Sequence, residues 1–203
     1  MDWLSMNITI THLSKKYGKK EILKDINYTF LGSNKYYIIG ENGVGKTSLF
    51  KAILKQVSYT GTIEVNGRIS YQPEEAVFPP YMHVISFIKT FATLTEKNDK
   101  IDQEIMAYLK NFSMEKLKDA WLGSLSKGQK QKVNIIQALL TPSEILIMDE
   151  PFSGLDQASK AYLKKVLDKE KRLILVVSHL RDEPALYGYK IIELKTGEMR
   201  EIS

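Results

Sequence analysis

The hydrophobic pattern of the first third of the chain is that of strands. Apolar and polar residues alternate, or short apolar runs stand between polar turns, as expected for strands with one or both faces buried. A turn at 17–20 separates the first two strands, a helix over 47–54 follows the third, and Asn66-Gly67 between the last two predicts a hairpin. The predicted strands are 6–14, 26–30, 36–39, 60–65 and 68–71.

The pattern changes to helical spacing between residues 79 and 121. Apolar residues recur three and four positions apart over 84–94 and 101–112, with a polar break at 96–99. Beyond this region strands and helices alternate up to a terminal hairpin that turns at Thr196-Gly197. The predicted elements there are helix 126–140, strand 145–148, helix 157–170, strand 173–177 and hairpin 190–202.

This order of elements predicts the fold class. Strands that alternate with helices are typical of an α/β fold with a mostly parallel sheet. We therefore expect a single domain over 1–203, with an antiparallel β portion near its start and an inserted α-helical lobe. The core would comprise residues 1–78 and 126–203, and the lobe about 79–125.

Composition and charge exclude several classes of protein. The 203 residues are 43% apolar and contain no cysteine, which excludes disulfides and thiolate metal sites. No apolar run approaches the roughly 18 residues that span a bilayer, and no signal peptide is evident, so we expect a soluble chain. The net charge of +5 comes from scattered lysines that alternate with acidic residues. This pattern favours a solvated surface over a nucleic-acid-binding face.

The loop after the strand at 36–39 carries the clearest chemistry. Residues 40–47 read Gly-Glu-Asn-Gly-Val-Gly-Lys-Thr and match the pattern G-x-x-x-x-G-K-[ST] between a strand and a helix. Glycines let backbone N–H groups converge on phosphate oxygens, and the helix start points its positive dipole end at the same anion. Lys46 would bind the terminal phosphates, and the Thr47 hydroxyl suits Mg²⁺. The predicted nucleotide-binding residues here are Gly40, Asn42, Gly43, Val44, Gly45, Lys46, Thr47 and Ser48.

An acidic pair, Asp149-Glu150, follows the apolar strand at 145–148. Ligands bind at the carboxyl ends of strands in open α/β sheets, so this pair is expected near the phosphate-binding loop. Asp149 would hold Mg²⁺ through water, and Glu150 would polarise an attacking water molecule. An isolated Asp-Glu pair is often a solvated strand end, but together with the loop it predicts a catalytic pair.

A turn at Ser126-Lys127-Gly128-Gln129 precedes the helix that leads to this strand. Ser126 is a good N-cap, and the next N–H groups are available to an anion. An ordinary capped helix would explain Ser126 but not Gly128 and Gln129. The turn is expected too far from the phosphate-binding loop of its own subunit to reach the nucleotide, so a second chain would have to present it.

With these motifs the chain resembles the ATP-binding-cassette (ABC) ATPases over essentially its whole length. The family's motifs occur in the family's order, from the P-loop through Leu125-Ser126-Lys127-Gly128-Gln129, the signature, to a histidine after the last core strand. The resemblance implies a P-loop NTPase core that binds ATP and Mg²⁺. It also implies roles for further residues: Gln72 at Mg²⁺ and the water, Asp156 against the opposing subunit, His179 on the γ-phosphate and Tyr17 stacked on adenine. His12 and His83 match no motif and are expected to be structural.

Two positions depart from the broad family pattern. Lys127 stands where the signature has glycine, and Lys132 stands where an arginine is often found. Binding of phosphate through backbone N–H groups tolerates a side chain at position 127. The lysine at position 132 keeps the positive charge but lacks the planar guanidinium group of arginine. Within the family, a signature with lysine at this position is familiar from the branch that resembles exporters of drugs, antibiotic peptides and lantibiotics. We therefore expect an active enzyme and favour export.

The resulting prediction is an ATP-hydrolysing subunit that dimerises around two ATP and Mg²⁺ and drives separate transmembrane permease subunits. By resemblance the permease would dock near Gln72 and residues 74–81, on the cytoplasmic face of a membrane, and no nucleic-acid partner is expected. The second ATPase subunit would be identical or related. A stand-alone ABC ATPase of cofactor or complex assembly is the alternative. A P-loop kinase or GTPase would leave the signature and His179 unexplained, and the sequence has no Asn-Lys-x-Asp run.

Overall fold

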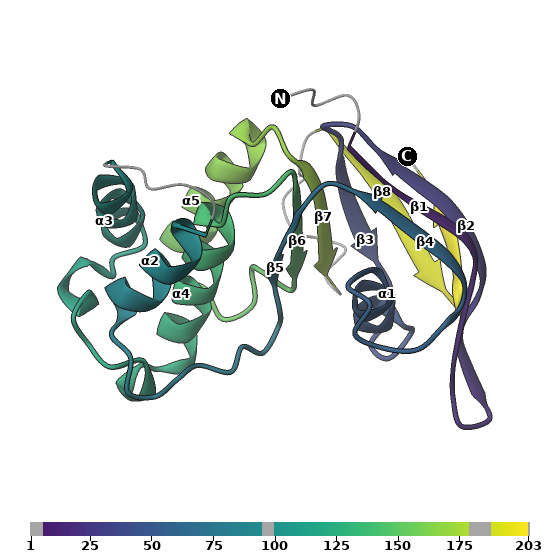
Figure 1. Ribbon diagram of the computed structural model, residues 1–203, viewed down its shortest axis with the longest axis horizontal. Coiled ribbons are helices and arrows are strands. Elements are labelled where there is room, and N and C mark those ends of the chain that lie inside the picture. The colour runs from purple at the N-terminus through teal and green to yellow at the C-terminus, as the bar shows by residue number, and fades with distance from the viewer. Residues whose placement is uncertain (1–5, 95–99, 179–187, 203) are drawn as a thin grey trace. The chain divides into compact units, whose positions relative to one another are not determined.

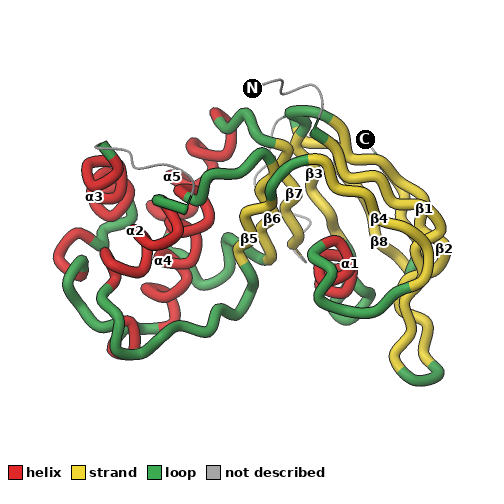
Figure 2. The backbone as a smooth tube through the Cα atoms, viewed as in Figure 1, coloured by secondary structure: helices red, strands yellow, loops and turns green. Residues whose placement is uncertain are grey.

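The computed structural model describes residues 6–94, 100–178 and 188–202 (Figure 1). The chain divides into two compact units. The first comprises Met1–Ile69, Glu144–Glu150 and Lys171–Ser203, and the second comprises Ser70–Ser143 and Pro151–Glu170. Most strands belong to the first unit and most helices to the second (Figure 2).

One sheet of the first unit is antiparallel and has three strands, β1 (Asn7–Tyr17), β2 (Lys20–Leu31) and β4 (Thr60–Asn66). Their order is β2-β1-β4, so β1 lies between the other two. The alternation at the start of β1 is real, because Ile8 and Ile10 are fully buried while their neighbours are more exposed. The predicted hairpin around Asn66-Gly67 is wrong. The neighbour of β4 is β1, whose long antiparallel edge offers more pairing than the short strand after the turn.

The second sheet of the first unit is mostly parallel. It contains β3 (Lys35–Ile39), β6 (Ile145–Asp149), β7 (Leu173–Ser178), β8 (Tyr189–Lys195) and β9 (Glu198–Glu201). The order of these strands is β6-β7-β3-β8-β9, and only β9 runs antiparallel to its neighbour. Every residue of β6 and β7 is buried, as expected of continuous apolar runs in a covered parallel sheet. The helix α1 (Lys46–Ile53) follows β3.

The second unit is helical apart from β5 (Ile69–Gln72), which starts at its boundary. Its core is formed by one apolar face of α2 and of α3 and by the centre of α4, which is buried nearly all round, and includes the fully buried Ile88, Ile105, Leu109 and Ile135. The elements are α2 (Val84–Ala92), α3 (Ile101–Asn111), the short 3₁₀ helices η1 (Glu115–Leu117) and η2 (Leu122–Ser124), α4 (Lys127–Leu140) and α5 (Gln157–Lys169).

The predicted fold class is confirmed: the fold is mixed α/β, with a parallel main sheet and an antiparallel β portion near the start. The sequence-based boundaries of the core (1–78 and 126–203) and the lobe (79–125) stay a prediction, because the two units are defined by packing and not by family boundaries. Within the described residues no helix is long and apolar enough to cross a membrane.

Candidate functional site

The phosphate-binding loop joins β3 to α1 within the first unit. Gly45 takes the N-cap position of α1 with φ 120°, and no side chain caps the helix. A Cβ at Gly45 would lie 2.9 Å from a side-chain carbon of Ile22, so both backbone conformation and space demand glycine there. The N–H groups at the start of α1 are therefore left for an external acceptor, which is the requirement for binding an anion.

Lys46 and Thr47, the first two residues of α1, are held by this loop and by β6. The Lys46 ammonium is buried and donates hydrogen bonds to the carbonyls of Gly40 (2.7 Å) and Glu41 (3.1 Å). The Thr47 hydroxyl donates to the Asp149 carboxylate over 3.1 Å, across 102 residues of sequence. A cation, a hydroxyl and a carboxylate thus meet at the carboxyl end of the parallel strands, as the motif spacing predicted.

Glu150 follows β6 in a strained conformation. Its φ of 51° is unfavourable for a residue other than glycine, and its N–H donates to the carbonyl of Val177 (2.9 Å). The Ser178 hydroxyl, at the end of β7, donates to Glu150 Oε2 (3.1 Å), and both side chains are buried. Backbone strain of this kind persists where the surroundings fix a functional side chain. Ser178 was not predicted as a site residue, although its position at a strand end was a signal.

A cavity of about 630 Å³ runs along the start of the loop, inside the first unit. Its lining combines lysine and glutamate side chains with apolar residues such as Ile22. Its walls come from the loop, from β2 and from the turn between β8 and β9, and are residues 20–22, 24, 40–44 and 193–197. Tyr17, at the end of β1, is 48% exposed.

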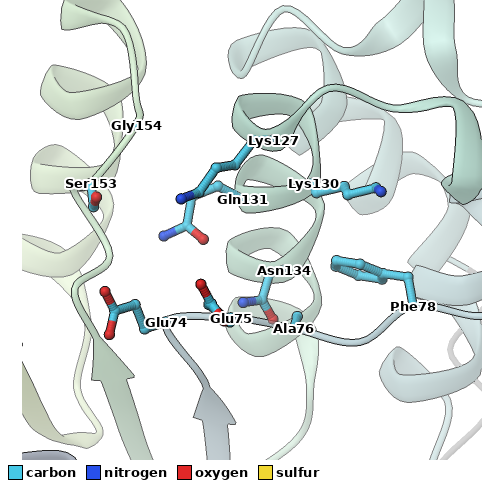
Figure 3. A pocket seen from close by; sticks show the side chains of 10 residues that line it. All are labelled: Glu74, Glu75, Ala76, Phe78, Lys127, Lys130, Gln131, Asn134, Ser153 and Gly154. Carbon is cyan, nitrogen blue, oxygen red and sulfur yellow. The ribbon is translucent and has the colours of Figure 1, made fainter.

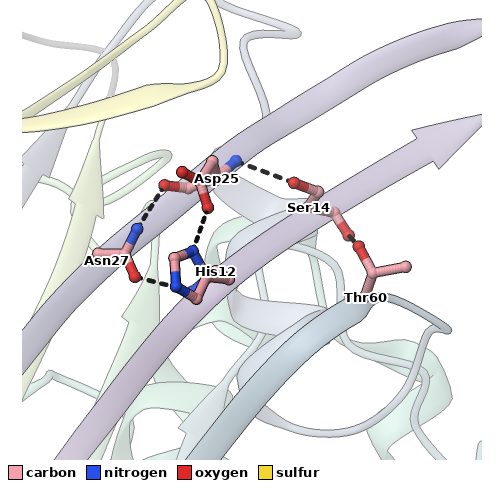
Figure 4. Close-up of polar contacts among 5 residues, drawn as sticks. All are labelled: His12, Ser14, Asp25, Asn27 and Thr60. Atoms are coloured by element: carbon pink, nitrogen blue, oxygen red, sulfur yellow. Dashed lines mark hydrogen bonds and ion pairs between the residues drawn. The ribbon is translucent and has the colours of Figure 1, made fainter.

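The structure describes two of the three histidines of the sequence. His179 lies outside the described residues. On β1, His12 contacts Asp25 through Nδ1 (2.7 Å), and its N–H donates to Asn27 Oδ1 (2.8 Å), as Figure 4 shows. His83 caps the start of α2 with its backbone, and its ring stacks on Trp121 at a centroid distance of 4.0 Å.

The signature turn belongs to the second unit, where it starts α4 with a complete capping box. The Ser126 hydroxyl accepts a hydrogen bond from the Gln129 N–H (3.3 Å), and the Gln129 side chain accepts one from the Ser126 N–H (2.9 Å). A Cβ on Gly128 would approach the Gly154 carbonyl to 3.1 Å. The structural role of a cap therefore explains Gln129 as well as Ser126, contrary to expectation. The N–H groups of Lys127 and Gly128 are the ones left for an anion.

A cavity of about 270 Å³ lies beside this turn, wholly within the second unit (Figure 3). The side chains of Lys127 and Gln131 point into the space between α4 and the Ser153-Gly154 turn, whereas Lys130 points away. Glu74 and Glu75, which follow β5, and the residues Ala76, Phe78 and Asn134 complete the lining.

Asp156 is held inside its own subunit. It is the N-cap of α5, where its carboxylate accepts hydrogen bonds from the Ser159 N–H (2.9 Å) and hydroxyl (3.0 Å). Lys132 donates to the same carboxylate (2.6 Å) and to the carbonyl of Phe112 (3.0 Å). The hydrogen bond from Lys132 is the largest cause that lowers the pKa of Asp156 far below its usual range, and the bonds from Ser159 add to it.

Gln72 ends β5 and is fully buried. Its side-chain amide donates to the carbonyl of Pro73, and Asn134 on α4 donates to the same carbonyl (2.8 Å). These bonds fix the chain direction after β5. The structure thus brings together the P-loop, Asp149 and Glu150 in the first unit, and Gln72, the signature turn and Asp156 in the second.

Comparison with known proteins identifies the family. Residues 23–153 match the family described as ABC transporter. The chain is 31% identical to an uncharacterized ABC transporter ATP-binding protein of Methanocaldococcus jannaschii, over 94% of this chain and 75% of that protein. It is 30% identical to an aliphatic sulfonates import ATP-binding protein of Bacillus subtilis, over 97% of this chain and 84% of that protein.

The chain covers less than two thirds of the length of some other relatives. The chain spans 65% and 57% of the length of two further curated relatives, from Mycoplasma pneumoniae and Bacillus subtilis. A solved structure described as the ATP binding subunit of an ABC transporter superposes with a TM-score of 0.87. It covers 97% of this chain and 89% of its own, at 24% identity, and this likeness establishes the fold alone.

Proposed function

This chain belongs to the ABC transporter family as an ATP-binding ATPase subunit, and from that premise we propose that it hydrolyses ATP between two paired subunits to drive separate membrane proteins. The observation that supports this proposal most strongly is that a cation and two hydrogen-bonded pairs of polar side chains are grouped in the first unit. Lys46, the Thr47–Asp149 pair and the Ser178–Glu150 pair all lie at one edge of the sheet, which is where hydrolysis of a bound nucleotide needs them.

The proposed hydrolysis requires positioning and charge stabilisation more than covalent chemistry. The open N–H groups of the loop would hold the phosphate oxygens, and Lys46 would exchange its contacts with two loop carbonyls for the terminal phosphates. Glu150 would orient and polarise the attacking water, with Ser178 fixing its carboxylate. By the family resemblance Gln72 would contact Mg²⁺ and the attacking water, and His179 would contact the γ-phosphate.

The donor set fits Mg²⁺ held jointly with a nucleotide. Mg²⁺ prefers oxygen ligands and commonly binds one or two carboxylates together with substrate phosphates and waters. Thr47 and Asp149 supply a hydroxyl and a carboxylate 3.1 Å apart, and the described residues contain no cluster of three acidic or histidine ligands that would hold a metal alone. Bound there, Mg²⁺ would neutralise developing phosphate charge.

The base of ATP would stack on Tyr17, and the signature turn would complete the site of a second subunit. The N–H groups of Lys127 and Gly128 and the Lys127 ammonium would face the phosphates held by the partner. Asp156 would face the partner through its turn, while its carboxylate is engaged with Ser159 and Lys132. Each pair of subunits would then contain two ATP sites, each formed by both chains.

Permease subunits are the proposed membrane partners, and the docking surface would be the segment 74–81. Val77 is 98% exposed and Tyr81 is 86% exposed, which is unusual for large apolar side chains and typical of an interaction surface. The segment borders the cavity in Figure 3. The proposed location is accordingly the cytoplasmic face of a membrane.

The direction of transport stays a prediction. Export and the lantibiotic-type branch were favoured by Lys127, but the relative from Bacillus subtilis reported above is named for the import of aliphatic sulfonates. The names of relatives therefore lend no support to export. The alternative of a stand-alone assembly ATPase predicts the same nucleotide site without a membrane partner.

The Glu150→Gln variant tests the nucleotide chemistry. It should bind ATP and lose turnover by roughly 10²–10⁴-fold, because the residue that polarises water is removed. Light scattering should show a dimer with ATP and Mg²⁺, and a Lys46→Ala/Glu150→Gln control should stay monomeric. Undiminished turnover in Glu150→Gln would refute the proposed role.

Copurification from membranes tests the biological role. An affinity-tagged chain should bring down a multi-span membrane protein, and changing Val77 and Tyr81 to Ser should abolish this without loss of ATP binding. Recovery of soluble partners alone, equally with both variants, would favour the assembly ATPase.

A further inference from the structure

Lys15 is a buried cation that the proposed chemistry leaves unused. Only 7% of the residue is exposed, although lysines are almost never buried without a partner. Its ammonium lies over the ring of Tyr17, 4.6 Å from the ring centroid, and donates to the Ser58 hydroxyl at 3.3 Å. Among the described residues no carboxylate pairs with it. The ring face and the hydroxyl are what compensate its charge.

The neighbouring lysine shows that burial is specific to this position. Lys16 is on the same strand, its side chain is 62% exposed, and it pairs with Glu21 at 3.3 Å. The contact of the Lys15 ammonium with the Tyr17 ring shows that these two side chains share one face of β1, whereas Lys16 is exposed to solvent. The two lysines thus form a matched pair, one beneath the aromatic ring and one in solvent.

A β-bulge at His12 is the first of three register irregularities between β1 and β2, the others lying between Leu13 and Lys16, and it shifts the inward positions of β1 by one residue. Between Ile10 and Leu13 the strand β1 advances three residues while its partner β2 advances two, and β4 shows the same offset. His12 has φ 51°, as an extra residue in a bulge commonly requires. Continued alternation from Ile10 would have directed Lys16 inward and Tyr17 outward, and the extra residue reverses this.

Polar contacts with the neighbouring strand hold the bulge in place (Figure 4). The His12 N–H and ring contact Asn27 and Asp25, and Asp25, also at positive φ (47°), donates its N–H to the Ser14 hydroxyl (2.9 Å). Thr60 on β4 donates to the Ser14 carbonyl (3.4 Å). The register of Lys15 and Tyr17 is therefore specified by a network that satisfies the backbone groups freed by the bulge.

We propose that Lys15 is a positioning residue for recognition of the nucleotide base: its ammonium covers one face of the Tyr17 ring and holds the ring so that the other face meets the base. This inference rests on the proposed stacking of adenine on Tyr17. An aromatic ring has two faces, Lys15 occupies one, and the half-exposed state of Tyr17 leaves the other to a ligand. Lys15 itself touches no substrate.

The test compares a ligand that has a base with one that lacks it. Dissociation constants for ATP and for inorganic tripolyphosphate, both with Mg²⁺, are measured for the wild type and for Lys15→Met, Lys15→Arg and Lys16→Met. Lys15→Met should bind ATP about three- to tenfold more weakly and tripolyphosphate unchanged. Lys15→Arg should retain ATP binding because guanidinium also packs on aromatic faces, and Lys16→Met should match the wild type.

A Tyr17→Ala background completes a double-mutant cycle. There Lys15→Met should have no further effect on ATP binding, and unchanged tripolyphosphate binding in each sample shows that the P-loop is folded. Equal weakening of both ligands, or an ATP effect of Lys15→Met that persists without Tyr17, would overturn the proposal. Unchanged ATP binding by Lys15→Met would also overturn the proposed role of Lys15. If the wild type still binds ATP more tightly than tripolyphosphate, the stacking of the base on Tyr17 would stand without that role. A wild type without that preference would refute the platform at Tyr17 itself.

Discussion

The two helix starts that we assign to phosphate binding are built in opposite ways. The start of α1 has glycine at the N-cap, positive φ and no side-chain cap, so its N–H groups depend on a ligand. The start of α4 has a capping box in which Ser126 and Gln129 satisfy each other, so it is complete without a ligand. The first is a cradle that is shaped for an anion. The second is a self-supporting turn that retains only the N–H groups of Lys127 and Gly128 for a partner's nucleotide.

This difference matches the division of labour that we propose. We propose that the cradle, which contains Lys46 and lies beside Asp149, binds the nucleotide in its own subunit. A turn that is stable before binding can be presented to a second chain at little ordering cost, because preorganised groups lose less freedom on association. Asp156 extends the pattern, since α5 also begins with a side-chain cap.

The largest effect on ATP binding is expected from removing the positive charge of Lys46. Lys46→Ala should weaken ATP binding by about 100-fold, because charge-assisted contacts to the terminal phosphates are lost. Titration of a fluorescent ATP analogue measures this. Lys51→Ala, in the last turn of the same helix and exposed, is the control and should bind normally. Equal affinity of Lys46→Ala and Lys51→Ala would break the assignment of the loop.

Exchanging the two caps should have unequal consequences. Gly45→Ser should cost about 1–3 kcal/mol of stability, because serine at φ 120° is strained and its Cβ meets Ile22. Ser126→Gly should cost only a few tenths of a kcal/mol, because glycine is also tolerated at an N-cap. Urea unfolding measures both. If Gly45→Ser were as stable as Ser126→Gly, the contrast between cradle and capped turn would be wrong.

The smallest effect concerns the cap of α5 and its dependence on pH. Lys132 and Ser159 lower the pKa of Asp156, so their contribution to stability is present above the ordinary aspartate pKa of 3.8 and is lost as pH falls below it. Lys132→Met should reduce this acid-sensitive contribution, which is under about 1 kcal/mol because the carboxylate is half-exposed, and leave the part that comes from Ser159. Lys132→Arg should preserve it. Urea midpoints between pH 3 and pH 7 that fall in parallel for Lys132→Met and the wild type would contradict this role of Lys132.

Fixed spacing made part of the site predictable. The P-loop and the acidic pair could be placed because a strand end fixes where the next residues project, and Thr47 and Asp149 meet as expected. The contacts that hold the site residues in place join segments far apart in the sequence, so no local sequence pattern indicates them. Ser178 reaches Glu150 from another strand, and Lys132 reaches Asp156 from another helix.

Register and pairing were harder to predict than the elements themselves. Asn66-Gly67 is a strong hairpin signal, but the pairing of β4 with β1 prevailed because tertiary pairing overrides local turn preference. The bulge at His12 is equally invisible in the alternation of β1, since a polar residue at an exposed bulge looks like any other polar position. Its consequence, a buried Lys15, emerges only with the structure.

Mixing two inactive variants tests most directly whether the cradle of one copy works with the turn of another. Lys46→Ala removes the cradle's cation, and Gly128→Asp places a carboxylate at the signature N–H groups, so each variant alone should be inactive. An equal mixture forms pairs in which one site combines an intact cradle with an intact turn, and the account predicts recovery of about a quarter of wild-type ATP turnover. Turnover that stays at the level of the separate variants would contradict a site shared between two copies of this chain.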